Sequence, residues 1–153
     1  MQSVDLTALK RFDDDLKALL EEVPERRREL HERIARVVED EVRMQIGNSG
    51  LKDSSGRVKD WQEGHVGSRG GYAAVRPTST STGRNSPGAI TNYLENGHKI
   101  RTPSGNSKHY RPRIKKAYVD GFHFYSSAKN TVESKVIAEA EKYVKEITER
   151  LEG

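Results

Sequence analysis

Apolar residues near the beginning of the chain recur in steps of three and four, the spacing of one helical face. The residues of this stripe are Leu6, Leu9, Phe12, Leu16, Leu19, Leu20 and Val23. Asp5 precedes them as a suitable N-cap. Because proline cannot continue a helix but suits the first turn of a new one, we expect this helix to end between Val23 and Pro24.

A second apolar stripe, with members four residues apart, predicts a second helix after Pro24. Its members are Leu30, Ile34, Val38, Val42 and Ile46, of which we expect the first three to be buried. Its other face is a mixture of Arg and Glu. Residues 47–50, Gly-Asn-Ser-Gly, supply the stop.

The middle of the chain predicts short elements joined by loops. Residues 58–66 and 72–75 indicate two strands, and the glycine-rich residues 67–71 between them permit a hairpin turn. Residues 77–88 are almost wholly Thr, Ser, Gly, Pro, Arg and Asn, which predicts a mobile loop. Residues 89–96 can form a short helix that ends at Gly97.

The last part predicts a strand followed by a long helix. Residues 118–125 are rich in aromatic side chains, as is typical of a strand, with Phe122 and Phe124 on one face. The helical stripe beyond it consists of Val132, Val136, Ala140, Tyr143, Val144, Ile147 and Leu151. We expect the pairs Glu141–Lys145 and Glu146–Arg150 to support its solvent side.

This order of elements predicts one α+β domain over residues 1–153, with two N-terminal helices, a small, mainly antiparallel sheet and a long C-terminal helix. Leu, Ile, Val and Phe make up about one fifth of the chain, close to the roughly 20% below which highly charged chains are usually disordered. The net charge is only +4. We therefore expect a folded domain with a thin core that neighbouring subunits complete.

The composition excludes several classes of protein. The chain has no cysteine, so disulfides, thiolate zinc sites and cysteine nucleophiles are absent. No apolar run approaches the roughly 20 residues of a membrane span, and residues 1–23 lack the uncharged core of a signal peptide. We expect a soluble protein of a cytoplasm-like compartment, without a membrane partner.

Basic charge is concentrated in the middle of the chain. Residues 54–127 hold 12 Lys and Arg against 4 Asp and Glu, a net charge of +8. The densest stretch, which we name the basic segment (residues 99–116), has no acid, and its cations are Lys99, Arg101, Lys108, Arg111, Arg113, Lys115 and Lys116. We expect a mobile loop that meets an acidic partner or passing DNA, with Tyr110 and Tyr118 available for stacking on bases.

Candidate chemistry is sparse. A nuclease would use His98, His109 or His123 with Glu95 or Asp120, but Gly97 interrupts the Glu95–His98 pair and the chain has no second pair of this kind. Residues 67–71 lack the spacing of phosphate-binding loops and precede a strand, so they predict a turn rather than a nucleotide site. We expect no catalytic residue, metal or cofactor.

Four short motifs occur in an order that resembles a known protein family. They are Gly-Arg-Val-Lys-Asp-Trp at 56–61, Gly-Gly-Tyr-Ala-Ala-Val-Arg-Pro at 70–77, Tyr-Leu-Glu-Asn-Gly-His at 93–98, and Arg-Pro at 111–112 within the basic segment. From about residue 24 onward the chain resembles the tail-completion, or neck, proteins of long-tailed bacteriophages, a family that includes the minor tail protein Z of phage lambda. After the second helix only Asp-Ser-Ser-Gly-Arg at 53–57 remains of a longer family segment, which leaves a tail terminator of a contractile or flexible tail as an alternative.

The resemblance implies a non-enzymatic virion protein at the head–tail junction, assembled in the host cytoplasm. It implies a homo-oligomeric ring, typically a hexamer, that contacts adjacent neck, tail-terminator or tail-tube proteins while DNA passes through its lumen. The family's turn falls on Tyr93, Glu95, Gly97 and His98, with a structural role. A small basic nucleic-acid-binding protein is the other alternative, centred on residues 99–116.

Overall fold

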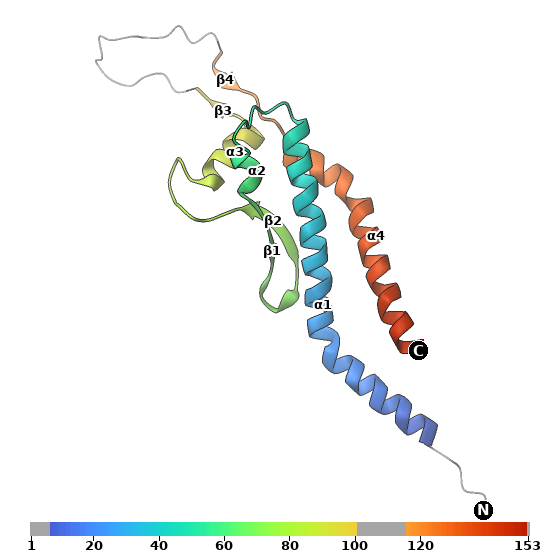
Figure 1. Cartoon of the computed structure of the whole chain (residues 1–153). Helices are drawn as coiled ribbons and strands as arrows, with labels where there is room; N and C mark the ends of the chain where they lie inside the picture. Colours follow the sequence, from blue (N-terminus) through green and yellow to red (C-terminus); the bar gives the residue numbers. More distant parts are fainter. Residues whose placement is uncertain (1–6, 101–115, 153) are drawn as a thin grey trace, which may run out of the picture.

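Two long helices dominate the computed structural model, which describes residues 7–100 and 116–152 (Figure 1). Helix α1 (Thr7–Asn48) and helix α4 (Phe124–Glu152) lie side by side and antiparallel. A β-hairpin packs on another face of α1, and the smaller elements gather near the C-terminal end of that helix. This arrangement confirms the predicted α+β class.

Helix α1 runs through Pro24, so the prediction of two N-terminal helices separated at that residue is wrong. Proline removes one N–H and crowds the carbonyl four residues earlier, but the turns on both sides keep their own hydrogen bonds. The helix therefore continues, and its axis changes direction in the blue part of the ribbon (Figure 1). The predicted stop is confirmed, because α1 ends at Asn48 and Gly50 has a φ of 80°. The proposed cap, Asp5, lies outside the described residues.

The predicted hairpin is confirmed in its strands but not at its start. Strand β1 (Gln62–Val66) pairs antiparallel with β2 (Ala73–Pro77), and the short 3₁₀ helix η1 (Ser68–Gly70) lies in the turn. Residues 57–60, expected in part as strand, form the short helix α2 (Arg57–Asp60). The Asp53 carboxylate accepts the N–H groups of Val58 and Lys59 at 3.0 and 3.2 Å, which favours the helical turn.

Helix α3 (Pro87–Asn96) is ended by Gly97, as predicted. It begins two residues earlier than predicted, after Ser86, whose side chain accepts the Ala89 N–H. The expected loop 77–88 is correspondingly shorter, because Pro77 belongs to β2 and residues 87–88 to α3. Strand β3 (His98–Lys99) then pairs with β4 (Tyr118–Val119).

The predicted strand 118–125 is wrong beyond Val119. Phe122 precedes α4 and Phe124 is its first residue, so the two side chains do not share a strand face. The positive φ of His123, 52°, turns the chain into the helix. The helix is then stabilised at its first turn by a carboxylate from α3, described below.

The core is small. Among the described residues, its buried cluster consists of Val42, Ile46, Val58, Phe124 and Ala128. Leu30, Ile34 and Val38, predicted to be buried, are only partly covered, because the elements that pack on α1 leave the edges of that stripe open. In the described part of the chain, no helix combines the length and apolar character that crossing a membrane requires.

Candidate interaction site

Glu95 is buried in the last turn of α3, where its carboxylate caps the N-terminus of α4. Its two oxygens accept the backbone N–H of Tyr125 at 2.9 Å and that of Ser126 at 3.1 Å. These N–H groups lie in the first turn of α4 and have no partner within the helix. A negative charge at this end of a helix is also favoured by the helix dipole. The Glu95 carboxylate thus joins the end of α3 to the start of α4.

Two glycines allow the chain to cross itself beside this cap. Phe122 N–H donates to the Leu94 carbonyl at 2.7 Å, which brings residues 121–123 against the end of α3. A Cβ on Gly121 would lie 2.1 Å from the Glu95 carbonyl oxygen. A Cβ on Gly97, whose φ is 75°, would lie 2.3 Å from the Val119 carbonyl oxygen. Any larger residue at either position must separate the two segments.

The same crossing holds the two ends of the basic segment together. Ile100 N–H donates to the Ala117 carbonyl at 3.0 Å, and the Tyr118 hydroxyl donates to the Asn96 carbonyl at 2.7 Å. Lys99 and Lys116 are exposed here. The other predicted cations, Arg101, Lys108, Arg111, Arg113 and Lys115, lie outside the described residues.

Of the residues considered for acid–base chemistry, the four that the structure describes are not assembled into a catalytic group. His98 is exposed and its ring packs against Tyr93, with centroids 5.5 Å apart. His123 and Asp120 are exposed, while the Glu95 carboxylate is occupied by the backbone of α4. His109 lies outside the described residues. Within residues 7–100 and 116–152, no group of three His, Asp or Glu side chains is placed to hold a metal ion.

Gln62 forms a second buried polar contact, which the sequence pattern did not indicate. The Tyr125 hydroxyl donates to Gln62 Oε1, and Gln62 Nε2 donates to the Val58 carbonyl at 2.9 Å. Burial, with a smaller contribution from the Glu95 charge, raises the pKa of Tyr125 to about 12. The phenol therefore stays protonated and links the start of α4 to β1.

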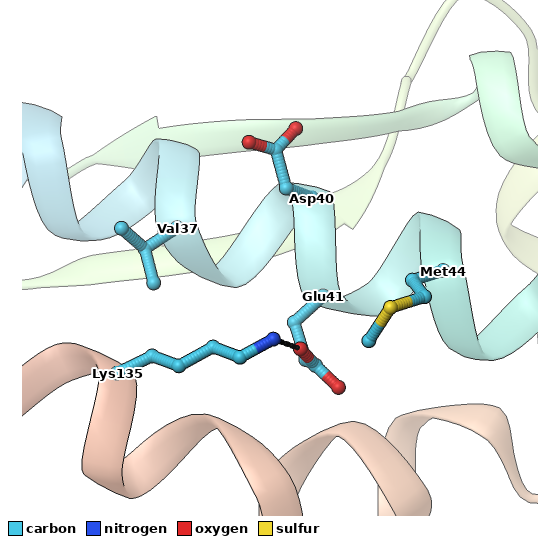
Figure 2. A pocket seen from close by; sticks show the side chains of 5 residues that line it. All are labelled: Val37, Asp40, Glu41, Met44 and Lys135. Atoms are coloured by element: carbon cyan, nitrogen blue, oxygen red, sulfur yellow. Dashed lines mark hydrogen bonds and ion pairs between the residues drawn. The ribbon is translucent and has the colours of Figure 1, made fainter.

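Glu41 is the buried charge between α1 and α4 (Figure 2). Its carboxylate accepts hydrogen bonds from Gln45 at 2.8 Å and Thr131 at 2.5 Å. It also forms an ion pair with Lys135, drawn as a dashed line in Figure 2. The Gln45, Lys135 and Thr131 hydrogen bonds lower the pKa of Glu41 to about 2. Beside it lies a groove of about 320 Å³, lined by Val37, Asp40, Glu41, Met44 and Lys135.

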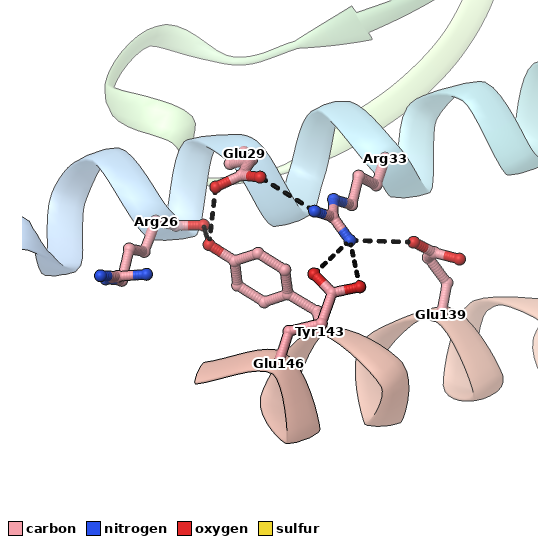
Figure 3. Close-up of polar contacts among 6 residues, drawn as sticks. All are labelled: Arg26, Glu29, Arg33, Glu139, Tyr143 and Glu146. Carbon is pink, nitrogen blue, oxygen red and sulfur yellow. Dashed lines mark hydrogen bonds and ion pairs between the residues drawn. The ribbon is translucent and has the colours of Figure 1, made fainter. Parts of the chain in front are cut away.

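Arg33 forms a second polar contact between the helices (Figure 3). Its guanidinium lies 3.0 Å from Glu29, 3.6 Å from Glu139 and 2.9 Å from Glu146. The Glu29 hydrogen bond is the largest of the interactions that raise the pKa of Arg33. Glu146 was predicted to lie on the solvent side of α4, paired with Arg150. It faces α1 instead, while the Arg150 side chain lies outside the described residues.

Tyr143 completes this contact. Its hydroxyl donates to the Arg26 carbonyl at 2.7 Å, and its ring lies 5.0 Å from the Arg33 guanidinium carbon. Tyr143 as a whole is 4% exposed. The other predicted pair, Glu141–Lys145, is not formed, because Lys145 lies on the solvent side 3.8 Å from Glu149 instead.

The outer surfaces of both long helices expose large apolar side chains. On α4, Ile137 and Val144 are 50% and 58% exposed, and they are seven residues apart and so lie on one face. On α1, Leu20 and Val23 are 61% and 46% exposed. The polar contacts thus lie between the helices, while part of the apolar surface faces outward.

Comparisons with known proteins give no relative from which a function can be transferred. No protein family, no curated protein and no solved structure matches this chain.

We expect Glu95→Ala to destabilise the fold. Leaving two N–H groups of α4 without their acceptor costs about 1–3 kcal/mol, and each kcal/mol lowers the Tm by about 2–4 °C at this chain length. Thermal unfolding followed by circular dichroism measures this. Glu95→Gln keeps a hydrogen-bond acceptor and should lower the Tm less. His98→Ala, at an exposed position nearby, should have the Tm of the original chain. An unchanged Tm for Glu95→Ala would refute the cap.

The lowered pKa of Glu41 predicts an acid-dependent loss of stability. The folded pKa, about 2, lies below the ordinary 4.5, so the contribution is complete above pH about 4.5 and declines as the pH falls toward 2. Glu41→Gln should reduce the slope of Tm against pH between these values. Asp40→Asn, one residue earlier and exposed, serves as the control and should retain the slope. Equal slopes in all three proteins would contradict the assignment.

Proposed function

We propose that this chain is a structural subunit of the head–tail junction of a long-tailed bacteriophage, without enzymatic activity. In this proposal identical copies form a ring that connects the neck to the tail and lets DNA pass. A tail terminator is the alternative within the same class. The order of motifs from residue 56 to residue 112 supports the proposal.

The observation that carries the proposal is the exposed apolar surface of the long helices. The small core leaves Ile137 and Val144 on one open face of α4, and Leu20 and Val23 exposed on α1. Burying such side chains against a neighbouring copy is favourable by about 25 cal/mol for each Å² of apolar surface removed from water. A subunit of an assembly gains this free energy, whereas an isolated domain does not.

The geometry of the Glu95 turn agrees with a structural role. The carboxylate that a nuclease would need is bonded to the first turn of α4. His98 packs on Tyr93, and its ring is not among the hydrogen-bond partners of Glu95. The turn instead brings the two ends of the basic segment together, where Lys99 and Lys116 are exposed to a neighbouring subunit or to DNA.

The purified protein should form closed rings, visible by negative-stain electron microscopy and as one fast-sedimenting species. The double variant Ile137→Asp and Val144→Asp should sediment as a smaller species with an unchanged circular dichroism spectrum, because charge on the exposed face opposes its burial. Asn130→Asp with Ser134→Asp places two charges at other exposed positions of α4 and should leave the rings intact.

Two outcomes contradict this proposal in different ways. Rings that survive the double variant exclude this face of α4 as the interface. A protein that is monomeric at all concentrations and never enters virions refutes the proposed function itself.

A small basic nucleic-acid-binding protein is the second candidate. Lys99 and Lys116 are exposed at the base of the basic segment, beside the exposed rings of Tyr93 and Tyr118. Cations that contact phosphates and aromatic rings that stack on bases are the usual components of such a surface.

Neutralising Arg111, Arg113, Lys115 and Lys116 together to Gln should separate the two candidates. If DNA binding is the function, affinity should fall and the slope of log K against log salt should decrease by about 3–4, since each phosphate contact contributes about 0.9. Fluorescence anisotropy with duplex DNA measures both. Loss of tail joining with unchanged DNA affinity would instead favour the structural function.

A further inference from the structure

The two outer edges of the sheet formed by β1 and β2 differ in whether their outward backbone groups are hydrogen-bonded. Gly67 N–H donates to the Tyr72 carbonyl at 2.9 Å, which marks positions 67 and 72 as a hydrogen-bonded pair. Such pairs alternate along an antiparallel ladder, so the pairs His65–Ala74 and Glu63–Arg76 are also hydrogen-bonded. The residues between them direct their N–H and C=O groups away from the partner strand.

Side chains of α1 close the outer edge of β1. Gly64 N–H points outward and donates to Glu39 Oε2 at 2.6 Å. The Gln62 carbonyl also points outward and accepts from Arg43 Nη2 at 3.0 Å. Glu39 and Arg43 form an ion pair at 2.7 Å, which fixes both side chains along the strand. No further strand can add on this side without displacing α1.

The outer edge of β2 has no such cover. The same alternation directs the N–H and C=O groups of Ala73 and Val75 outward. Within the described residues, no side chain or backbone group forms a hydrogen bond with them. At the C-terminal end of this edge, Pro77 has no N–H to donate. At its N-terminal end, the exposed residue Tyr72 precedes β2. Open edges of this kind are usually blocked in proteins by bulges, charges or covering elements.

We propose that the outer edge of β2 binds an extended strand of a protein partner, in a manner that does not depend on the proposed function. Ala73 and Val75 present donor and acceptor pairs two residues apart, or about 7 Å along the strand. A peptide backbone repeats its own donors and acceptors at this spacing, so strand addition satisfies all four groups.

The side chains of β2 define the partner further. Ala74 and Arg76 occupy the outer face of the sheet and would lie opposite closely spaced, non-hydrogen-bonded positions of an added strand. The small side chain of Ala74 leaves space for an aromatic residue. Arg76 is exposed, with its Nη2 3.2 Å from His65 Nε2, and favours an opposing carboxylate. Val75 contributes to the core, so an apolar residue suits the position opposite it.

Hydrogen exchange measured by NMR tests this proposal with the peptide Thr-Glu-Val-Tyr-Val-Thr, capped at both ends. In the free protein the amides of Ala74 and Arg76 should be protected, whereas those of Ala73 and Val75 should exchange rapidly. Peptide at about ten times its Kd should slow exchange at Ala73 and Val75 by about tenfold, because only the free fraction exchanges.

Matched controls separate strand addition from adsorption of the peptide. Replacing Glu by Lys in the peptide should weaken binding. N-methylation of its first Val, which would lie opposite Val75, removes a backbone donor and should do the same. In the protein, Ala73→Pro removes an outward N–H at the first residue of the strand, where proline is tolerated, and should weaken binding about three- to tenfold.

Three results would overturn the proposal. Unchanged exchange at Ala73 and Val75 in saturating peptide shows that the edge does not accept a strand. Equal binding of the N-methylated peptide shows that the backbone is not recognised. Protection of the two amides in the pure protein that rises with its concentration identifies the occupant as a second copy of this chain.

Discussion

The arrangement of the smaller elements depends on the Glu95 carboxylate at the N-terminus of α4. This contact sets where α4 begins, which places Phe124 in the core and directs the helix back along α1. It also holds residues 121–123 against the end of α3, so that β3 and β4 meet. One buried charge therefore determines both the long helix and the anchoring of the basic segment.

Beyond the apolar core, where Val42 and Ile46 of α1 meet Phe124 and Ala128 of α4, the two long helices are joined by polar contacts. Glu41 and Arg33 each have several partners on both helices, and Tyr143 reaches the backbone of α1. Such contacts require specific distances, so they define the register of α4 along α1 more strictly than apolar packing would. They add little hydrophobic stabilisation, which explains how long helices coexist with a small core and with exposed apolar side chains.

Local signals in the sequence predicted the local features well. The stop at residues 47–50, the hairpin and the end of α3 at Gly97 depend on glycines and strand patterns that act over a few residues. The errors concern tertiary contacts. Part of the strand expected at 118–125 is instead the start of α4, because Glu95 of α3, about thirty residues earlier, caps that helix. Glu146 has a suitable i,i+4 neighbour in sequence, but Arg33, 113 residues away, is the partner it finds. The burial of Gln62 could not be predicted either, because glutamine is usually exposed and nothing in its neighbouring sequence distinguishes it.

The three exposed surfaces discussed above lie on separate parts of the fold. The apolar face of α4, the open edge of β2 and the base of the basic segment belong to different elements, so occupation of one does not require rearrangement of another. Because α1 closes the edge of β1, a strand can add to this sheet only at β2, which gives such a contact a direction. When one patch of a molecule binds a different patch of its neighbour, the same contact can be repeated from molecule to molecule. The assembly is a closed ring where the rotation between neighbours brings the last molecule back to the first. The proposed ring and the proposed strand contact therefore use different surfaces of the chain, and each can be tested without disturbing the other.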